Sequence, residues 1–158
     1  MRDLAMDLDD LAEAMDDHDP EATWYLDLRT GEVNRWSDYE DDALDDDDVT
    51  PELRPFLAYM RDEPDAERDR FEEIPKIESH RAYDRMVAFA ARCEGRDARK
   101  QLARALEERG PFRRFRQVLE EFPELQQRWQ AEHDAYLEQE ARDWLEMIGI
   151  RPTPRARP

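Results

Sequence analysis

Hydrophobic residues at the start of the chain follow helical spacing and then strand spacing. In residues 2–17 the apolar side chains recur every three or four positions, which predicts a short amphipathic helix. Apolar and polar residues then alternate in TWYLDLRTGEVNRW, on both sides of Thr30 and Gly31. Alternation around a flexible corner predicts a β-hairpin with strands at 23–28 and 32–36. Its aromatic side chains indicate that one face of the hairpin packs against helices.

A strongly acidic segment follows the hairpin. Residues 38–50 carry eight acidic side chains and no basic one. One interpretation is a solvated loop. A second is a calcium loop, but an EF-hand needs alternating oxygen ligands and a Gly at its tight turn, and this segment has consecutive acids and no Gly. The third interpretation is a nucleic-acid mimic or a docking site for a basic partner.

The pattern beyond the acidic segment predicts a second helix and a third strand. Thr50 stands where an N-cap is favoured, and Pro51 stands at the first helical position. The short run RFEEIPKI predicts a strand at 70–74 that Pro75 ends, beside the hairpin.

The C-terminal half has helical spacing throughout. From Glu78 onward, four stretches each place their apolar residues on one helical face. Gly110 is a good stop for the second of these helices, and Pro111 starts the third. Pro123 opens the longest helix, which continues to Gly149.

These elements place the chain in the α+β class. A small antiparallel sheet, made of the hairpin and the third strand, is expected to pack on a mainly helical C-terminal layer. A length of 158 residues suits one domain, which we place at residues 1–150. The Pro- and Arg-rich tail, residues 151–158, is expected to be mobile.

The formal net charge of −18 is unevenly distributed along the chain. Residues 1–75 hold 27 acidic residues and 7 arginines, whereas residues 76–158 hold 15 acidic and 17 basic residues. Such acidity opposes general contact with nucleic acid or an anionic membrane surface. The chain has 22 arginines and only two lysines. This composition fits adaptation to high salt, where charge repulsion is screened, and equally a GC-rich genome.

The chain also carries features that bear on its location. Acidic residues near the N-terminus and the lack of an apolar core there predict no signal peptide. No apolar run approaches the ~20 residues that span a bilayer. The one cysteine, Cys93, cannot form an internal disulfide. We therefore expect a cytoplasmic protein without membrane contact.

The segment PFRRFRQVLEEF, residues 111–122, combines phenylalanines with arginines. Its phenylalanines fall on one helical face and are predicted to lie in the core. Arg113, Arg114 and Arg116 fall on the other faces. They are either solvated and partly paired, as Arg116 could be with Glu120, or they dock an anionic partner. No aromatic residue is interleaved among these arginines, which weakens a role in binding single-stranded nucleic acid.

Histidine and cysteine offer little for catalysis. His133 lies beside an apolar stripe and is expected to pack there, and Cys93 lies on a core face without a partner cysteine. His80 and Asp84 have a spacing that could place two metal ligands on one helical face, but no second histidine is near. The chain contains none of the common phosphate-binding, hydrolase or metalloprotease motifs. We expect no cofactor and no metal.

Three segments together resemble a known family. LDLRTGEV, IPKIESHRAYDRM and the stretch LARALEERGPFRRFRQVLEEFPELQQRW with its WLEMIGIRP ending are similar to uncharacterised protein family 0158, a family of small bacterial proteins. The resemblance covers residues 23–36 and 72–152. It implies a bacterial, cytoplasmic origin, and it implies that GPFRRFR belongs to the common scaffold. It carries no catalytic residue or cofactor to transfer.

The sequence favours a non-catalytic protein-interaction module. Its partner surfaces are predicted to be Arg113, Arg114 and Arg116, and the acidic residues Asp45, Asp46, Asp47 and Asp48. The partner is another protein or a second copy of this chain. One alternative is a nucleic-acid-related regulator that mimics or binds phosphates. The other is an enzyme with a carboxylate–histidine site around His80, Asp84 and Asp27.

Overall fold

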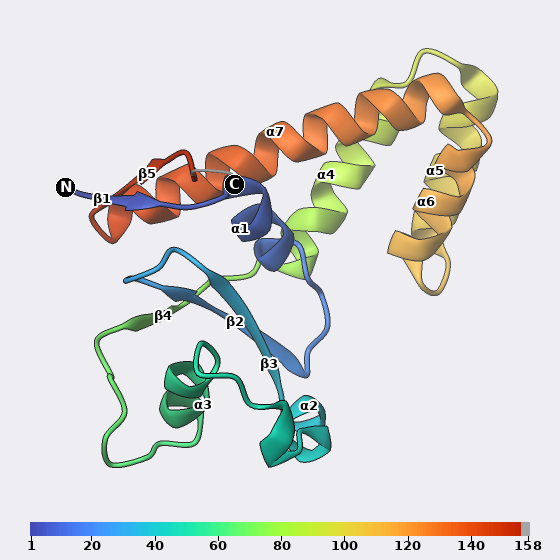
Figure 1. Ribbon diagram of the computed structural model, residues 1–158. Coiled ribbons are helices and arrows are strands. Elements are labelled where there is room, and N and C mark those ends of the chain that lie inside the picture. The colour runs from blue at the N-terminus through green and yellow to red at the C-terminus, as the bar shows by residue number, and fades with distance from the viewer. Residues whose placement is uncertain (156–158) are drawn as a thin grey trace. The chain divides into compact units, whose positions relative to one another are not determined.

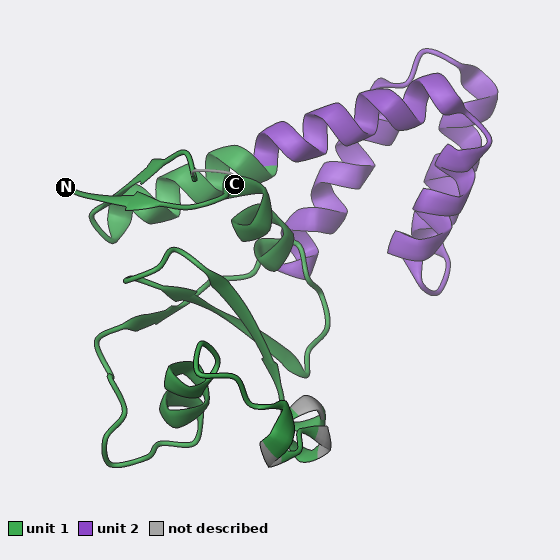
Figure 2. Cartoon of the chain, viewed as in Figure 1, with its two compact units in different colours: residues 1–76, 137–158 green, residues 77–136 purple. Residues whose placement is uncertain are grey.

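The computed structural model describes residues 1–155, apart from the side chains of Glu40, Ala43 and Asp46. The chain divides into two compact units (Figure 2). Unit 1 consists of residues 1–76 and 137–158, and unit 2 consists of residues 77–136. The chain length predicts a single domain, whereas the structure divides the chain into two compact units. Each unit is described below by itself.

A three-stranded antiparallel sheet forms the centre of unit 1 (Figure 1). It contains β2 (Ala22–Asp27), β3 (Val33–Ser37) and β4 (Phe71–Glu73), in the order β3-β2-β4. In the register of the sheet, Tyr25 lies opposite Asn34 on one side and Glu73 on the other. The predicted hairpin and the predicted third strand are therefore confirmed.

An aromatic cluster joins this sheet to the helix α3 (Arg54–Met60). The Phe56 ring of α3 lies 5.5–6.0 Å from rings on all three strands, and the Tyr59 ring lies 5.1 Å from Phe71. Aromatic pairs at these separations stabilise by more than the area they bury. The helix begins at Arg54, later than predicted. Thr50 instead closes a preceding turn, in which its side-chain oxygen accepts a hydrogen bond from the Leu53 amide at 3.2 Å.

The two ends of the chain form a pair of strands that the sequence pattern did not predict. Strand β1 (Arg2–Ala5) pairs in parallel with β5 (Ile150–Thr153). The first helix, α1 (Leu8–Met15), accordingly begins at Leu8 and not at residue 2, with the Asp7 side chain as its N-cap. Strand β5 also occupies the first part of the tail that we expected to be mobile. Residues 156–158, the end of that tail, lie outside the described residues.

The acidic segment, for which one interpretation was a solvated loop, contains two short helices. It contains α2 (Asp38–Ala43) and a short 3₁₀-helix, η1 (Asp46–Asp48). Asp41 accepts hydrogen bonds from two nitrogens of Arg61, at 2.7 and 3.1 Å. Arg61 directly follows α3, so this ion pair ties the segment to that helix and favours an ordered turn over a free loop.

Unit 2 is a helical unit. It contains α4 (Ser79–Arg92), α5 (Arg96–Glu107), α6 (Pro111–Glu120) and the first part of α7 (Pro123–Met147). Gly110 separates α5 from α6 with a φ of 63°, a left-handed conformation that glycine adopts without steric cost. Pro111 then occupies the first turn of α6, where its missing amide hydrogen costs nothing. The helix boundaries thus follow the sequence signals closely.

Three aromatic rings form the centre of the unit 2 core. Phe89, Phe115 and Trp129 are buried and lie edge to face, with ring centres 5.1–6.2 Å apart. The remaining buried members of the core are Met86, Ala90, Cys93, Leu102, Leu106 and Leu119.

The architecture of the chain is α+β, as predicted. None of the described helices has the length and apolar character to cross a membrane.

Candidate functional site

The helix α6 has one buried face and one charged face. Phe115 and Leu119 are almost fully buried, and Phe112 packs against the same core. The prediction that the phenylalanines of this segment belong to the core is confirmed for Phe115 and, at the edge of the core, for Phe112, whereas Phe122 is half-buried and is not part of this cluster. Arg113 and Arg116 are exposed and lie one helical turn apart, so they share part of the opposite surface. We call these two residues the Arg113/Arg116 face.

The described side chains offer no ion-pair partner to either arginine of this face. In particular, the helix spacing of Arg116 and Glu120 does not produce a pair among them. Two guanidinium groups with all their donors turned to solvent can form bidentate contacts with carboxylates or phosphates without breaking an existing pair.

Arg114 differs from its neighbours because it is already engaged. Its guanidinium forms an ion pair with Glu108 at 2.9 Å, and its Nε donates to the Arg109 carbonyl oxygen at 2.8 Å. Both contacts cross the turn between α5 and α6. Arg114 therefore stabilises this turn, and the sequence, which grouped it with Arg113 and Arg116, could not separate the two roles.

The whole α5–α6 region is basic. Residues 96–116 contain eight basic and three acidic residues, in a chain of net charge −18. A hollow of about 580 Å³ lies between the two helices, and its lining is mixed in charge, with Arg104 and Arg114 beside Asp97, Glu108 and Glu121. The excess positive charge thus lies on the helices and not in the hollow.

The other predicted partner surface, Asp45 to Asp48, belongs to unit 1. Asp45, Asp47 and Asp48 are exposed, whereas the side chain of Asp46 lies outside the described part of the chain. The Asp45 amide donates to the Asp48 carboxylate at 3.4 Å, a local contact that closes the 3₁₀ turn. Tyr39 of the adjacent helix α2 is also exposed, at 80%.

The residues of the enzyme alternative lie in different environments. His80 and Asp84 are exposed on α4, and His80 lies 3.2 Å from Glu78. His133 packs on Trp129, with the rings stacked 5.2 Å apart, which agrees with its predicted packing role. Cys93 is buried, and its burial raises the pKa of the thiol above its ordinary value. A thiol in this state is a poor nucleophile.

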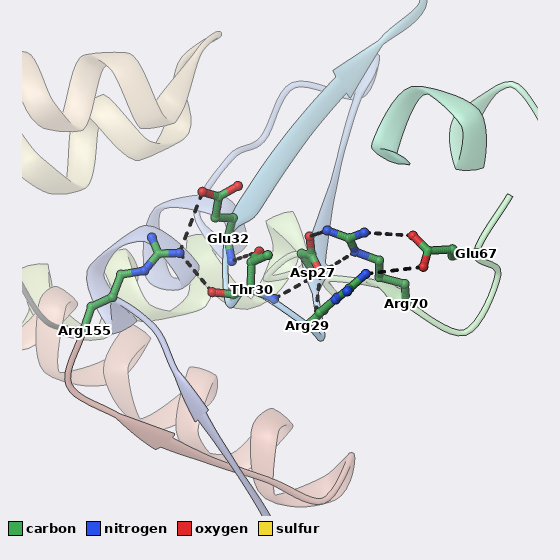
Figure 3. Close-up of polar contacts among 7 residues, drawn as sticks. All are labelled: Asp27, Arg29, Thr30, Glu32, Glu67, Arg70 and Arg155. Atoms are coloured by element: carbon green, nitrogen blue, oxygen red, sulfur yellow. Dashed lines mark hydrogen bonds and ion pairs between the residues drawn. The ribbon is translucent and has the colours of Figure 1, made fainter. Parts of the chain in front are cut away.

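Among the described side chains, Asp27 is the one buried carboxylate (Figure 3). It ends strand β2 and is 4% exposed. Its carboxylate accepts from the backbone amides of Arg29 and Thr30, at 2.9 and 3.3 Å, which closes the hairpin turn. It also forms a bidentate pair with Arg70, at 3.0 and 2.9 Å. Burial alone would raise the pKa of Asp27, but the hydrogen bonds from Arg70, Arg29 and Thr30 outweigh it and lower the pKa.

Arg70 connects Asp27 to a second carboxylate. Its remaining terminal nitrogen lies 2.8 Å from Glu67, and the other oxygen of Glu67 lies 3.6 Å from Arg29 (Figure 3). The hydrogen bond with Asp27 raises the pKa of Arg70, which therefore stays charged at any pH at which the protein folds. The Glu67 carboxylate thus bridges the guanidinium groups of Arg29 and Arg70.

This cluster borders a hollow of about 670 Å³ in unit 1. Its lining comes from strand β1, from the hairpin turn and from the segment before β4. The sequence analysis singled out Asp27 but missed Arg70 and Glu67. Asp27 and Arg70 are 43 positions apart, so no local spacing could pair them. The sequence feature that points to the pair is the predicted strand at 70–74, which was expected to lie beside the hairpin that contains Asp27.

Metal binding finds no support in the residues that the structure describes. They contain no group of three or more histidine, cysteine, aspartate or glutamate side chains placed to hold a metal ion.

The fold and the charged surfaces together define a small acidic α+β protein with a basic pair of helices. Residues 1–156 match the family described as "Uncharacterised protein family (UPF0158)", and the chain belongs to this family. It is similar to the UPF0158 protein PA5073 of Pseudomonas aeruginosa, with 34% identity over 158 residues, which cover all of this chain and 92% of the relative. These comparisons confirm the resemblance drawn from the sequence. No solved structure matches the chain.

Proposed function

We propose that this protein is a non-catalytic cytoplasmic interaction module that binds an acidic protein segment through the Arg113/Arg116 face. The observation that carries the proposal is that both arginines are exposed and have no ion-pair partner among the described side chains. Many other arginines of the chain are paired, for example Arg92 with Glu132 at 2.9 Å and Arg142 with Glu138 at 3.1 Å. Other exposed arginines, such as Arg2 and Arg54, also have no ion-pair partner among the described side chains, but Arg113 and Arg116 lie one turn apart on the same helix.

The helix α6 is well suited to present such a face. Phe115 and Leu119 fix its other side in the core, so the arginines project from a rigid element. Rigid placement lowers the entropy lost on binding, and complementary charge speeds association and selects the partner. Each arginine that forms a desolvated, bidentate pair with a carboxylate is expected to contribute about 1.5–3 kcal/mol.

A protein partner is favoured over nucleic acid for two reasons. Unit 1 holds 31 acidic and 12 basic residues, and this charge repels a phosphate backbone, which is charged along its whole length, more than it repels a short acidic protein segment. Within the described part of unit 2, no aromatic ring is among the exposed large hydrophobic side chains, so bases would find no stacking platform there. Asp45, Asp47 and Asp48 form a second surface that suits a basic partner or a second copy of this chain.

The experiment is a capture from lysate of the source organism, with and without nuclease treatment. The bait is the wild-type chain beside the Arg113→Glu/Arg116→Glu variant. The matched control is Arg2→Glu/Arg54→Glu, which changes the net charge equally but reverses two exposed arginines of unit 1 that also have no ion-pair partner among the described side chains. Arg114 is left intact because it stabilises the turn between α5 and α6.

We expect one or more acidic proteins to be retained by the wild type and by the control, and to be lost from the Arg113→Glu/Arg116→Glu variant. Retention should weaken as salt rises from 0.1 to 0.5 M. If all three baits retain the same proteins, the Arg113/Arg116 face is a solvated helix surface. If binding is lost only when nuclease is added, the partner is a nucleic acid and the alternative function replaces this one.

A further inference from the structure

We propose that the hollow beside Arg70 is a binding site for a small anion with a carboxylate or phosphate group, and that Glu67 occupies this site when the ligand is absent. The proposal concerns unit 1 and does not depend on the Arg113/Arg116 face. It rests on the orientation of Arg70, on the convergence of Arg29 and on the position of Glu67 (Figure 3).

Arg70 is held in place from behind. Its Nε and one terminal nitrogen bind the two oxygens of Asp27, whose side chain is 6% exposed. The Arg70 side chain is itself only 13% exposed. Its last terminal nitrogen is therefore fixed in direction, and it points at the Glu67 carboxylate. A guanidinium that is anchored on one edge by a buried carboxylate and paired on the other with an exposed one is preorganised to bind an anion in place of the exposed carboxylate.

Arg29 supplies the second positive charge. It follows β2 in the hairpin turn, and Asp27 holds its backbone amide at 2.9 Å. Its guanidinium and that of Arg70 each approach a different oxygen of Glu67, at 3.6 and 2.8 Å. Two arginines that share one carboxylate in this way also match the oxygens of a phosphate or of a ligand carboxylate.

Glu67 is well placed to give way to a ligand. It lies in the segment between α3 and β4, outside regular secondary structure, and its side chain is 51% exposed. Its partner Arg29 is 71% exposed, and ion pairs at that level of exposure contribute little to stability. A ligand with greater negative charge can therefore displace the Glu67 carboxylate at small cost, while Asp27 keeps Arg70 in position.

The hollow has the size and charge of a small-anion site. Its volume of about 670 Å³ lies within the ~300–1,000 Å³ of small-molecule sites. Four arginines and three acidic residues line it; of these, Asp3 is paired with Arg151 and Arg68 with Asp62, both at 2.5 Å. Glu67 is the acidic residue that both Arg29 and Arg70 contact, so its displacement leaves these two guanidinium groups to the ligand.

The test is a titration of the full chain with inorganic phosphate and, separately, with citrate, followed by the backbone amide shifts of Arg29, Thr30 and Arg70. The variants are Glu67→Gln, which removes the internal carboxylate, and Arg29→Gln, which removes one cation. The control is Asp65→Asn, an exposed residue of the same segment that changes the net charge by the same amount.

We expect Glu67→Gln to bind at least one of the two anions about fivefold or more tightly than the wild type, since a charge-assisted hydrogen bond no longer competes. Arg29→Gln should bind several-fold more weakly, and Asp65→Asn should match the wild type. Arg29 is exposed, so its substitution leaves the fold intact where a change at Arg70 would not. Equal affinities in Glu67→Gln and Asp65→Asn, or no shifts at Arg70 with either anion, would overturn the proposal.

Discussion

Asp27 shows how one side chain can determine both local and long-range structure. It closes the hairpin turn through two backbone amides and joins the turn to the start of β4 through Arg70. Its pKa is lowered because these hydrogen bonds favour the charged form more than burial disfavours it. A carboxylate with a lowered pKa in the folded state stabilises the fold above its unfolded pKa, and this contribution is lost as the pH falls through the folded value.

The substitution Asp27→Asn is therefore expected to cost stability in a pH-dependent way. At pH 7 it removes the buried charge that pairs with Arg70, whose side chain is 13% exposed, and we expect a loss of about 3 kcal/mol in the free energy of unfolding. As the pH falls below the ordinary value of 3.8, the wild type loses the same contribution, so the difference between the two proteins should shrink. Urea unfolding between pH 7 and pH 3 measures this difference, and a constant difference over that range would contradict the role given to Asp27.

At the scale of elements, α6 links the core of unit 2 to its surface. Phe115 lies 5.1 Å from Trp129 and is completely buried, whereas Phe112 is only partly buried at the edge of the same core. This packing fixes the backbone from which Arg113 and Arg116 project. The interaction surface and the core of unit 2 therefore depend on the same ten-residue helix.

Replacement of Phe115 with alanine should show this dependence. We expect Phe115→Ala to lower the free energy of unfolding by about 3–5 kcal/mol, because it leaves a cavity beside Trp129 and Phe89. Phe112→Ala, the matched control on the same helix, should cost clearly less. Chemical unfolding followed by tryptophan fluorescence compares the two, and equal losses would mean that α6 does not pack as described.

The elements also show what sequence can and cannot predict. The helices of unit 2 and the hairpin depend on local spacing and on stop signals such as Gly110, so their boundaries were predictable. The pairing of β1 with β5 joins residues about 150 positions apart, and a four-residue strand carries too short a pattern to compete with the helical spacing that follows it.

The candidate sites likewise contain some features that local spacing predicts and others that depend on tertiary structure. The exposure of Arg113 and Arg116 follows from helical periodicity alone, and the structure agrees. The engagement of Arg114 with Glu108 depends on the geometry of the turn between two helices, which the sequence does not specify. The pair of Asp27 and Arg70 depends on which strands are neighbours, and the sequence suggested this only loosely.

At the scale of the whole molecule, charge is divided between the two units. Unit 1 carries 31 acidic and 12 basic residues, whereas unit 2 carries 11 acidic and 12 basic residues. Repulsion within unit 1 opposes its compact state, and dissolved salt screens that repulsion, over ~3 Å at 1 M.

We therefore expect the melting temperature to rise as KCl increases from 0.1 to 2 M. The variant Asp45→Asn/Asp47→Asn/Asp48→Asn, which removes three exposed charges of unit 1, should start from a higher melting temperature and gain less from salt. Calorimetry of both proteins across the salt series measures the effect. A melting temperature that does not respond to KCl in either protein would show that charge repulsion has no part in the stability.

The proposed function requires that the exposed side of α6 contacts a protein partner. The most direct measurement is photo-crosslinking in lysate from position Gln117, an exposed residue beside Arg113 and Arg114 on that helix. The variant Gln117→p-benzoylphenylalanine is compared with Gln139→p-benzoylphenylalanine, an exposed glutamine of unit 1. We predict a protein adduct at position 117 that is absent at position 139 and that disappears when Arg113→Glu/Arg116→Glu is added. The same adducts at both positions, or adducts with nucleic acid alone, would contradict the claim.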